Sequence, residues 1–325
     1  MPLGRHDKRS FTAERRGVPL DSPGEELEEM ALAKFWRRNG AAYFFLMPWL
    51  IGLLIFTAIP VSASLYFSFT KYDILSNPQW IGLDNYMTIL TVDSNFIAAL
   101  KVTLIYVFLG VPLELIFALA LALFLSKGIR GLQYYRAIYY IPSLFGGSVA
   151  VAILWKQVFG ADGMLNGLLG LFGVEGTSWI AHPDYALYTI IILKVWQFGS
   201  PMIIFLAGLK QVPVELYEAA SIDGAGTWKK FARITLPLLT PIIFFNAVMQ
   251  TIGSFQAFTP AYVISDGTGG PLGSTLFYTL YLYQKGFASL QMGYASALAW
   301  LLLLLIAFVT ALVFLSAKRW VHYEN

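Results

Sequence analysis

The stretch Pro213–Pro237 reads PVELYEAASIDGAGTWKKFARITLP and is the longest charge-bearing interruption in an otherwise apolar chain. On each side of it lies an apolar run long enough to cross a bilayer, whose core of about 30 Å needs about 20 apolar residues per helix. A polar segment between two such runs has to lie outside the lipid. We therefore predict that this stretch is a docking element for a partner and that the other segments connect it to a pathway through the membrane.

The composition indicates a membrane protein built from helices. Of the 325 residues, 57% are hydrophobic and 13% are charged, whereas a soluble domain carries about 25% charged residues. The apolar runs are continuous and rich in Leu, Ile and Phe, which favours helices over the alternating strands of a β-barrel. The chain has no Cys and three scattered His, so we expect no disulfide and no metal site, and we expect no nucleic-acid partner.

Six apolar runs predict six transmembrane helices. Their expected ranges are 42–64, 97–124, 138–158, 185–208, 238–263 and 291–316. Six spans place both termini on one side, and most of the 22 Lys and Arg residues lie in the tails and loops of that side. Because such an excess marks the cytoplasmic side, both termini and the polar stretch are expected in the cytoplasm. The expected fold class is an all-α polytopic membrane protein.

The membrane domain is expected to cover residues 41–320, between two cytoplasmic tails. Residues 1–40 are polar, and Ser22-Pro-Gly-Glu25 resembles a capping box that begins a short amphipathic helix. A solvated flexible tail is the alternative for residues 1–20. Residues 321–325 form the C-terminal tail. The first apolar run begins too late for a secretory signal peptide.

Two short helices joined by a turn are predicted inside the polar stretch. Pro213 pre-sets a helix start, and Glu215 suits the first turn of the helix dipole. Gly224 supplies the left-handed conformation that ends many helices. Thr227 is expected to cap a second helix that runs to Ile234, before the next span begins. An interfacial hairpin that rests on lipid headgroups is the alternative interpretation.

Within this hairpin Glu218-Ala219-Ala220 is followed after three residues by Gly224, and nine residues separate Gly224 from Ile234-x-Leu236-Pro237. This spacing resembles the EAA loop of ABC importer permeases. The resemblance implies that the hairpin is the coupling helix, which inserts into a cleft on an ATP-binding subunit. The positions to which it gives this role are Glu218, Ala219, Ala220, Gly224, Ile234, Leu236 and Pro237.

Further segments resemble the carbohydrate-uptake permeases of the maltose-transporter type. They are Val111-Pro112-Leu113, Tyr140-Ile-Pro142, Gly267–Thr275 and Gly293–Leu298. The resemblance implies a MetI-like type I permease fold in a bacterial cytoplasmic membrane, as the first of two unlike permeases in a heterodimer. It also implies two ATP-binding subunits, which hold the ATP and Mg, and an extracytoplasmic solute-binding protein. The chain lacks the large extracytoplasmic insert of the maltose permease, which puts maltose in doubt as the cargo.

The sequence indicates that energy comes from a partner. It has no Gly-x4-Gly-Lys-Ser/Thr phosphate loop, so we expect no ATP hydrolysis, no bound cofactor and no catalytic residue in this chain. An ion-coupled carrier would need several ionisable groups inside the membrane, and only Glu114 and Lys194 lie clearly within spans. A stand-alone carrier or channel remains an alternative, as does an importer of glycerol phosphate, amino acids or metal. A membrane enzyme has no catalytic constellation to support it.

Polar and aromatic residues of the spans are candidates for the solute pathway. Amides bond sugar hydroxyls and rings stack on sugar C–H faces, although the same residues also serve helix packing in membranes. Lys194 and Glu114 either form a structural ion pair across about 10 Å of depth or contact water separately. Alternatively, Lys194 meets an acidic oligosaccharide, such as an alginate- or pectin-derived uronate oligomer. The candidates are Glu114, Lys194, Trp196, Gln197, Asn246, Gln250, Phe255 and Gln256, with Gln250 and Phe255 preferred.

Overall fold

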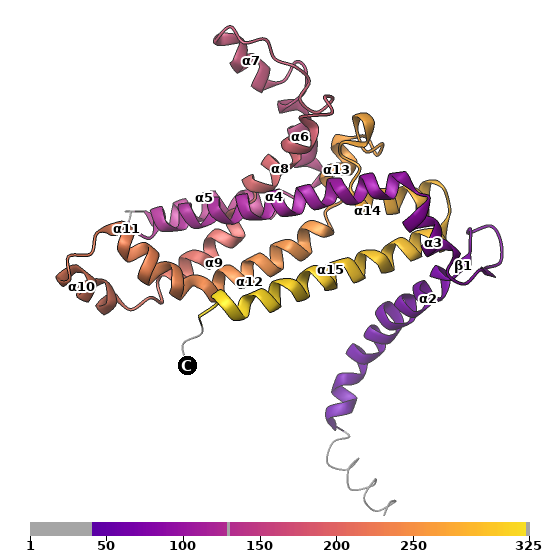
Figure 1. The fold of residues 1–325 in the computed structure, drawn as a ribbon, viewed down its shortest axis with the longest axis horizontal. Coiled ribbons are helices and arrows are strands. Elements are labelled where there is room, and N and C mark those ends of the chain that lie inside the picture. The colour runs from indigo at the N-terminus through magenta and orange to yellow at the C-terminus, as the bar shows by residue number, and fades with distance from the viewer. Residues whose placement is uncertain (1–40, 129–130, 323–325) are drawn as a thin grey trace, which may run out of the picture. The chain divides into compact units, whose positions relative to one another are not determined.

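The computed structural model describes residues 41–128 and 131–322 (Figure 1). The chain divides into two compact units, of which the first ends at Ser62 and the second begins at Ala63. The amphipathic helix expected in residues 1–40 lies outside the described residues, and so do residues 323–325 of the C-terminal tail.

The first helix spans Ala41–Ser68. It contains a π-turn, η1 (Leu54–Ala58), and ends as α2 (Ile59–Ser68). Pro60 explains the π-turn, because a proline ring clashes with the carbonyl four residues earlier in a regular helix. Apolar side chains such as Phe45 (81% exposed) and Phe56 (80%) lie uncovered in the first unit. An apolar helix surface of this kind is suited to lipid or to a partner chain.

Three long helices form the body of the second unit (Figure 1). They are α4 (Ser94–Leu125), a continuous helix over Thr227–Phe255, and α15 (Met292–Trp320). The middle one comprises α11 (Thr227–Lys230), the π-turn η2 (Phe231–Thr235) and α12 (Leu236–Phe255). The side chain of Asp93 caps α4 by accepting from the N–H groups of Asn95 and Phe96, as is usual for an aspartate at this position.

Two predicted spans are broken by sharp bends. The range 138–158 was expected as one span, but α5 (Leu132–Phe145) and α6 (Val149–Val158) meet at 98°. A Cβ on Gly146 at this bend would lie 2.2 Å from Cγ of Gln197, so the close approach requires glycine. The Ser148 side chain caps α6 by accepting from Val151 N–H.

The range 185–208 likewise consists of α8 (Ala186–Trp196) and α9 (Gly199–Leu209), which meet at 40°. Backbone groups freed by this break need new partners in a membrane. The Ser143 hydroxyl provides them, because it donates to the Gln197 carbonyl (2.7 Å) and accepts from the Ser200 N–H (2.9 Å). The described part of the chain thus has four unbroken candidate spans, or six if each bent pair counts as one.

Short elements connect the spans. The predicted span 238–263 ends earlier, at Phe255, because Gln256 leaves the helical conformation and a separate helix follows. β1 pairs with β2 antiparallel, with Thr70 opposite Trp80. The connecting elements are β1 (Thr70–Lys71), β2 (Gln79–Trp80), α3 (Asp84–Thr91), α7 (Met164–Leu171), α13 (Thr259–Ile264), η3 (Pro271–Gly273), α14 (Tyr278–Tyr283) and η4 (Gln284–Ala288).

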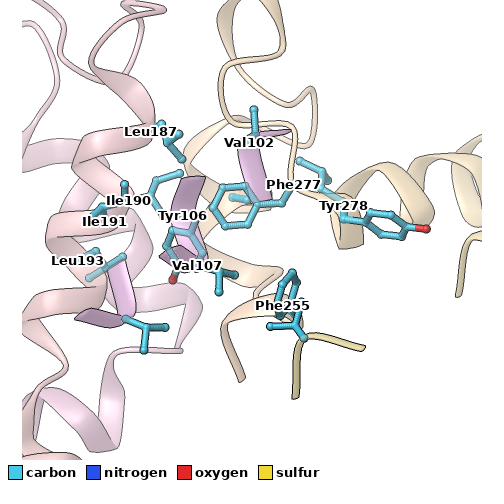
Figure 2. Packing of buried hydrophobic residues seen from close by; sticks show 14 of the residues in the cluster. Val102, Tyr106, Val107, Leu187, Ile190, Ile191, Leu193, Phe255, Phe277 and Tyr278 are labelled. Carbon is cyan, nitrogen blue, oxygen red and sulfur yellow. The ribbon is translucent and has the colours of Figure 1, made fainter. Parts of the chain in front are cut away.

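The hydrophobic core lies where α4 meets α8 and α14. Figure 2 shows side chains of α4, among them Tyr106, packed between Ile190 of α8 and Phe277. The rings of Tyr106 and Phe277 lie 4.7 Å apart. The backbone N–H of Tyr278 donates to Thr103 Oγ1 of α4 (2.8 Å), so α14 is held to α4 by a hydrogen bond as well as by packing.

Candidate functional site

The first half of the polar hairpin agrees with the sequence prediction. Helix α10 (Val214–Ile222) begins directly after Pro213 and carries Glu215 in its first turn. Beyond its end Gly224 takes a positive φ of 71°. The Ala225 N–H then donates to the Ala220 carbonyl (2.8 Å), which satisfies a carbonyl that the helix end leaves free.

The second half differs from the prediction. Thr227 does not cap a second helix: the residue before the helix is Gly226, and no side chain caps it. The helix also does not end at Ile234 but continues to Phe255. Pro237 is accommodated by the π-turn η2, in which the Leu236 N–H donates to the Phe231 carbonyl. A π-turn absorbs the proline here as it does before Pro60, so the hairpin is fused to the span that follows it.

Helix α10 has exposed side chains on its outer face and is attached to the following helix on its inner face. Glu218 and Ala219 are exposed, and Ile222 is 88% exposed. On the inner side the Tyr217 hydroxyl lies 2.8 Å from Thr235 Oγ1 in η2. Of the remaining positions that the family resemblance singles out, Ile234, Leu236 and Pro237 are half-buried on the long helix. The hairpin therefore combines a free outer face with a firm attachment to the helix Thr227–Phe255.

A buried ion pair lies inside the second unit. Lys194 Nζ of α8 is 2.7 Å from Glu114 Oε2 of α4, and the two side chains are 8% and 2% exposed. Lys194 Nζ also donates to Gln250 Oε1 of α12 (3.4 Å). Gly110 makes room for the lysine, because a Cβ there would lie 3.0 Å from Lys194 Cδ. Among the described residues these are the two buried charged side chains, and they pair with each other.

The other predicted pathway residues lie apart from this cluster. The Gln197 amide donates to the Gly146 carbonyl (3.1 Å) and supports the bend between α5 and α6. Asn246 donates to the Ile242 carbonyl of its own helix (3.1 Å). Phe255 is 1% exposed and belongs to the hydrophobic core, whereas Trp196 is 37% exposed and Gln256 is exposed. Of the eight candidates the structure brings together Glu114, Lys194 and Gln250.

A second polar cluster was not predicted from the sequence. Asp93 caps α4 with one oxygen and with the other accepts hydrogen bonds from the hydroxyls of Tyr281 and Tyr294. Burial acts to raise the pKa of Asp93, but these hydrogen bonds, the Phe96 N–H and the charge of Lys285 together lower it. The cluster borders a cavity of about 670 Å³ beside the β1–β2 hairpin and α3. The N-cap position of Asp93 was recognisable in the sequence, but its partners Tyr281 and Tyr294 are 188 and 201 residues away.

Among the described residues no group of three or more His, Asp or Glu is placed to hold a metal ion.

Comparison with known proteins shows the family to which the chain belongs. The family described as "Binding-protein-dependent transport system inner membrane component" matches residues 92–322. The probable ABC transporter permease protein YesP of Bacillus subtilis (strain 168) is 53% identical over 288 residues, which cover 88% of this chain and 93% of that protein. The lactose transport system permease protein LacF of Rhizobium radiobacter is 32% identical and covers 89% of this chain and 97% of its own.

The arabinooligosaccharides transport system permease protein AraP of Bacillus subtilis (strain 168) is 34% identical, over 85% of this chain and 88% of that protein. Among solved structures, a bacterial alginate ABC transporter in complex with alginate pentasaccharide-bound periplasmic protein superposes with a TM-score of 0.76. The identity is 23%, with 88% of this chain and 96% of that chain covered, so this match confirms the MetI-like permease fold.

The family match, the apolar helices and the sugar-transport relatives agree with one another, and the homologous proteins are transport permeases. The chain therefore belongs to the family of binding-protein-dependent transport system inner membrane components, as a multi-pass permease of a sugar ABC importer.

Proposed function

We propose that this permease takes an oligosaccharide from an extracytoplasmic binding protein and that ATP-binding subunits docked on α10 drive its passage. A second, unlike permease would complete the pathway, and ATP and Mg would be bound by the ATPase subunits. The observation that carries this proposal is the fusion of the exposed α10 hairpin with the long helix Thr227–Phe255.

This fusion supplies a mechanical route from the hairpin to the interior. The helix carries the hairpin at one end and Gln250 near the other, about 34 Å away at 1.5 Å per residue. The Tyr217–Thr235 and Lys230–Ser221 contacts hold α10 to it. A displacement of α10 by closing ATPase subunits would therefore move Gln250 relative to Lys194 and Glu114, which lie on α8 and α4.

The cargo assignment is supported by the relatives, whose names include lactose and arabinooligosaccharide permeases. Within the sugars we propose an acidic oligosaccharide, because the buried Lys194 would attract a carboxylate once movement of α12 loosens its contacts. The ion pair works against this, since Glu114 already neutralises Lys194 in the observed conformation. Glycerol phosphate and other non-sugar solutes remain the alternative cargo.

Docking is tested by placing a bulky side chain on the exposed face of α10. The Ala219→Trp variant should lose the ATPase subunit on co-purification, because the indole would block the close approach that a small residue permits. Ala161→Trp, at another exposed alanine in the loop after α6, is the matched control and should retain it. Equal retention of the ATPase subunit by both variants would refute docking on α10.

The cargo is tested with one single and one double variant in proteoliposomes that contain the assembled importer. Lys194→Gln leaves Glu114 without its cation, whereas Glu114→Gln/Lys194→Gln removes both charges. If Lys194 binds an acidic cargo, the double variant should recover transport of neutral sugars but not of uronate oligomers. Recovery of both would show that the pair is structural, and transport of glycerol phosphate in place of sugars would favour the alternative cargo.

A further inference from the structure

A cavity of about 710 Å³ lies behind the hairpin, on the side opposite the exposed face of α10. It is bordered by the C-terminal end of α4, the end of α9 and the first turns of the helix Thr227–Phe255. The apolar segments of α4 and α9 both end beside this cavity, so the cavity lies where the spans meet the headgroup layer. This position does not depend on which side of the membrane the hairpin occupies.

The lining divides into an apolar wall and a basic rim. Leu123 of α4, Leu209 of α9 and Phe231 form the apolar part. Lys127 and Lys230 supply positive charge, and none of the described residues that line the cavity is Asp or Glu. Neither lysine forms an ion pair with any described residue, and Lys230 is positioned by its hydrogen bond to Ser221 (2.5 Å).

Trp228 also lines this cavity and is 77% exposed. Its ring packs against Phe231, with 5.5 Å between the ring centroids. Exposed tryptophan beside lysine is typical of the membrane interface, where the ring lies among headgroups. Basic pockets between membrane helices bind anionic lipid headgroups, and here Leu123, Leu209 and Phe231 offer an apolar surface for acyl chains beside the two lysines.

We propose that this cavity binds one anionic phospholipid, with its phosphate between Lys127 and Lys230 and its acyl chains along Leu123 and Leu209. The lipid would bridge the end of α4 and the hairpin. It would thereby help to hold the hairpin at a fixed height against the membrane surface, in addition to the Tyr217–Thr235 and Lys230–Ser221 contacts.

The test uses the full chain, stripped of lipid in detergent, with binding of phosphatidylglycerol, phosphatidylcholine or inorganic phosphate followed by native mass spectrometry. Phosphatidylglycerol should bind one per chain and phosphatidylcholine should not. In Lys127→Gln/Lys230→Gln the affinity should fall about 25-fold, which corresponds to about 1 kcal/mol for each lysine. The control is Lys210→Gln/Lys229→Gln, which removes the same charge from exposed lysines outside the cavity lining and should bind like the unaltered chain.

Three results would overturn the proposal. Equal loss of affinity in the two double variants would mean general attraction to charge rather than a site. Competition by inorganic phosphate at the same concentration as the lipid would mean an anion site without a lipid. Unchanged lipid binding in Lys127→Gln/Lys230→Gln would mean that the lipid binds elsewhere on the chain.

Discussion

The Glu114–Lys194 pair allows a sharp prediction about stability. Lys194→Met keeps most of the apolar stem but removes the ammonium group, and Glu114 then keeps a buried charge whose Oε2 has no other hydrogen-bond partner. Breaking a buried pair in this way costs about 3 to 5 kcal/mol. Adding Glu114→Gln removes the uncompensated charge. We therefore expect Lys194→Met to lower the free energy of unfolding by about 3 kcal/mol and the double variant by only about 1 kcal/mol.

The assay is SDS titration of the detergent-solubilised chain, with helicity followed by circular dichroism. Glu114→Gln alone should cost less than Lys194→Met, because Lys194 retains its hydrogen bond to Gln250. If the double variant is less stable than Lys194→Met, the two side chains contribute independently. The reasoning that treats them as one compensated pair would then be refuted.

Three further variants test other parts of the structure. Gly208→Ala should lower the free energy of unfolding by about 1 to 3 kcal/mol through overpacking, because the added Cβ would lie 2.0 Å from Ile242 Cδ1. Gly253→Ala is the control, since its Cβ would have no atom within 4 Å. Equal shifts of the thermal unfolding midpoint in the two variants would contradict this. Tyr217→Phe removes the hydrogen bond to Thr235 and should lower the free energy of unfolding by about 1 kcal/mol. It should also reduce the sugar taken up per ATP hydrolysed, while the ATPase subunit stays bound. An unchanged ratio of uptake to ATP hydrolysis would count against the mechanical route. Because the folded-state pKa of Asp93 is lowered, its carboxylate stabilises the folded state at neutral pH, and this stabilisation is lost below about pH 4. The difference in unfolding free energy between Asp93→Asn and the unaltered chain should therefore shrink on acidification. A constant difference would contradict a stabilising role for the Asp93 carboxylate.

The helical class and the location of the spans could be predicted from the sequence because both depend on local composition. A run such as 97–124 is apolar enough to specify a helix wherever it lies, and the structure has α4 there. The start of α10 at Pro213 and the positive φ of Gly224 were likewise predictable. These features depend on backbone conformations that single residue types favour.

Bends and long-range pairs could not be predicted in this way. The 98° bend at Gly146 depends on the approach of Gln197, 51 residues later. The sequence suggested a depth mismatch between Glu114 and Lys194, but that estimate assumed straight helices, and the actual atoms lie 2.7 Å apart. Pro237 marked a boundary only on the assumption that proline ends a helix, whereas the π-turn η2 carries the helix through it.

The central claim is that ATP-binding partners drive transport through α10. Co-purification of the importer combined with uptake in ATP-depleted proteoliposomes tests this claim most directly. We predict that the unaltered chain retains an ATPase subunit and that sugar uptake stops when ATP is removed. Purification without an ATPase subunit, together with uptake that continues after ATP depletion, would contradict the claim and favour a stand-alone carrier.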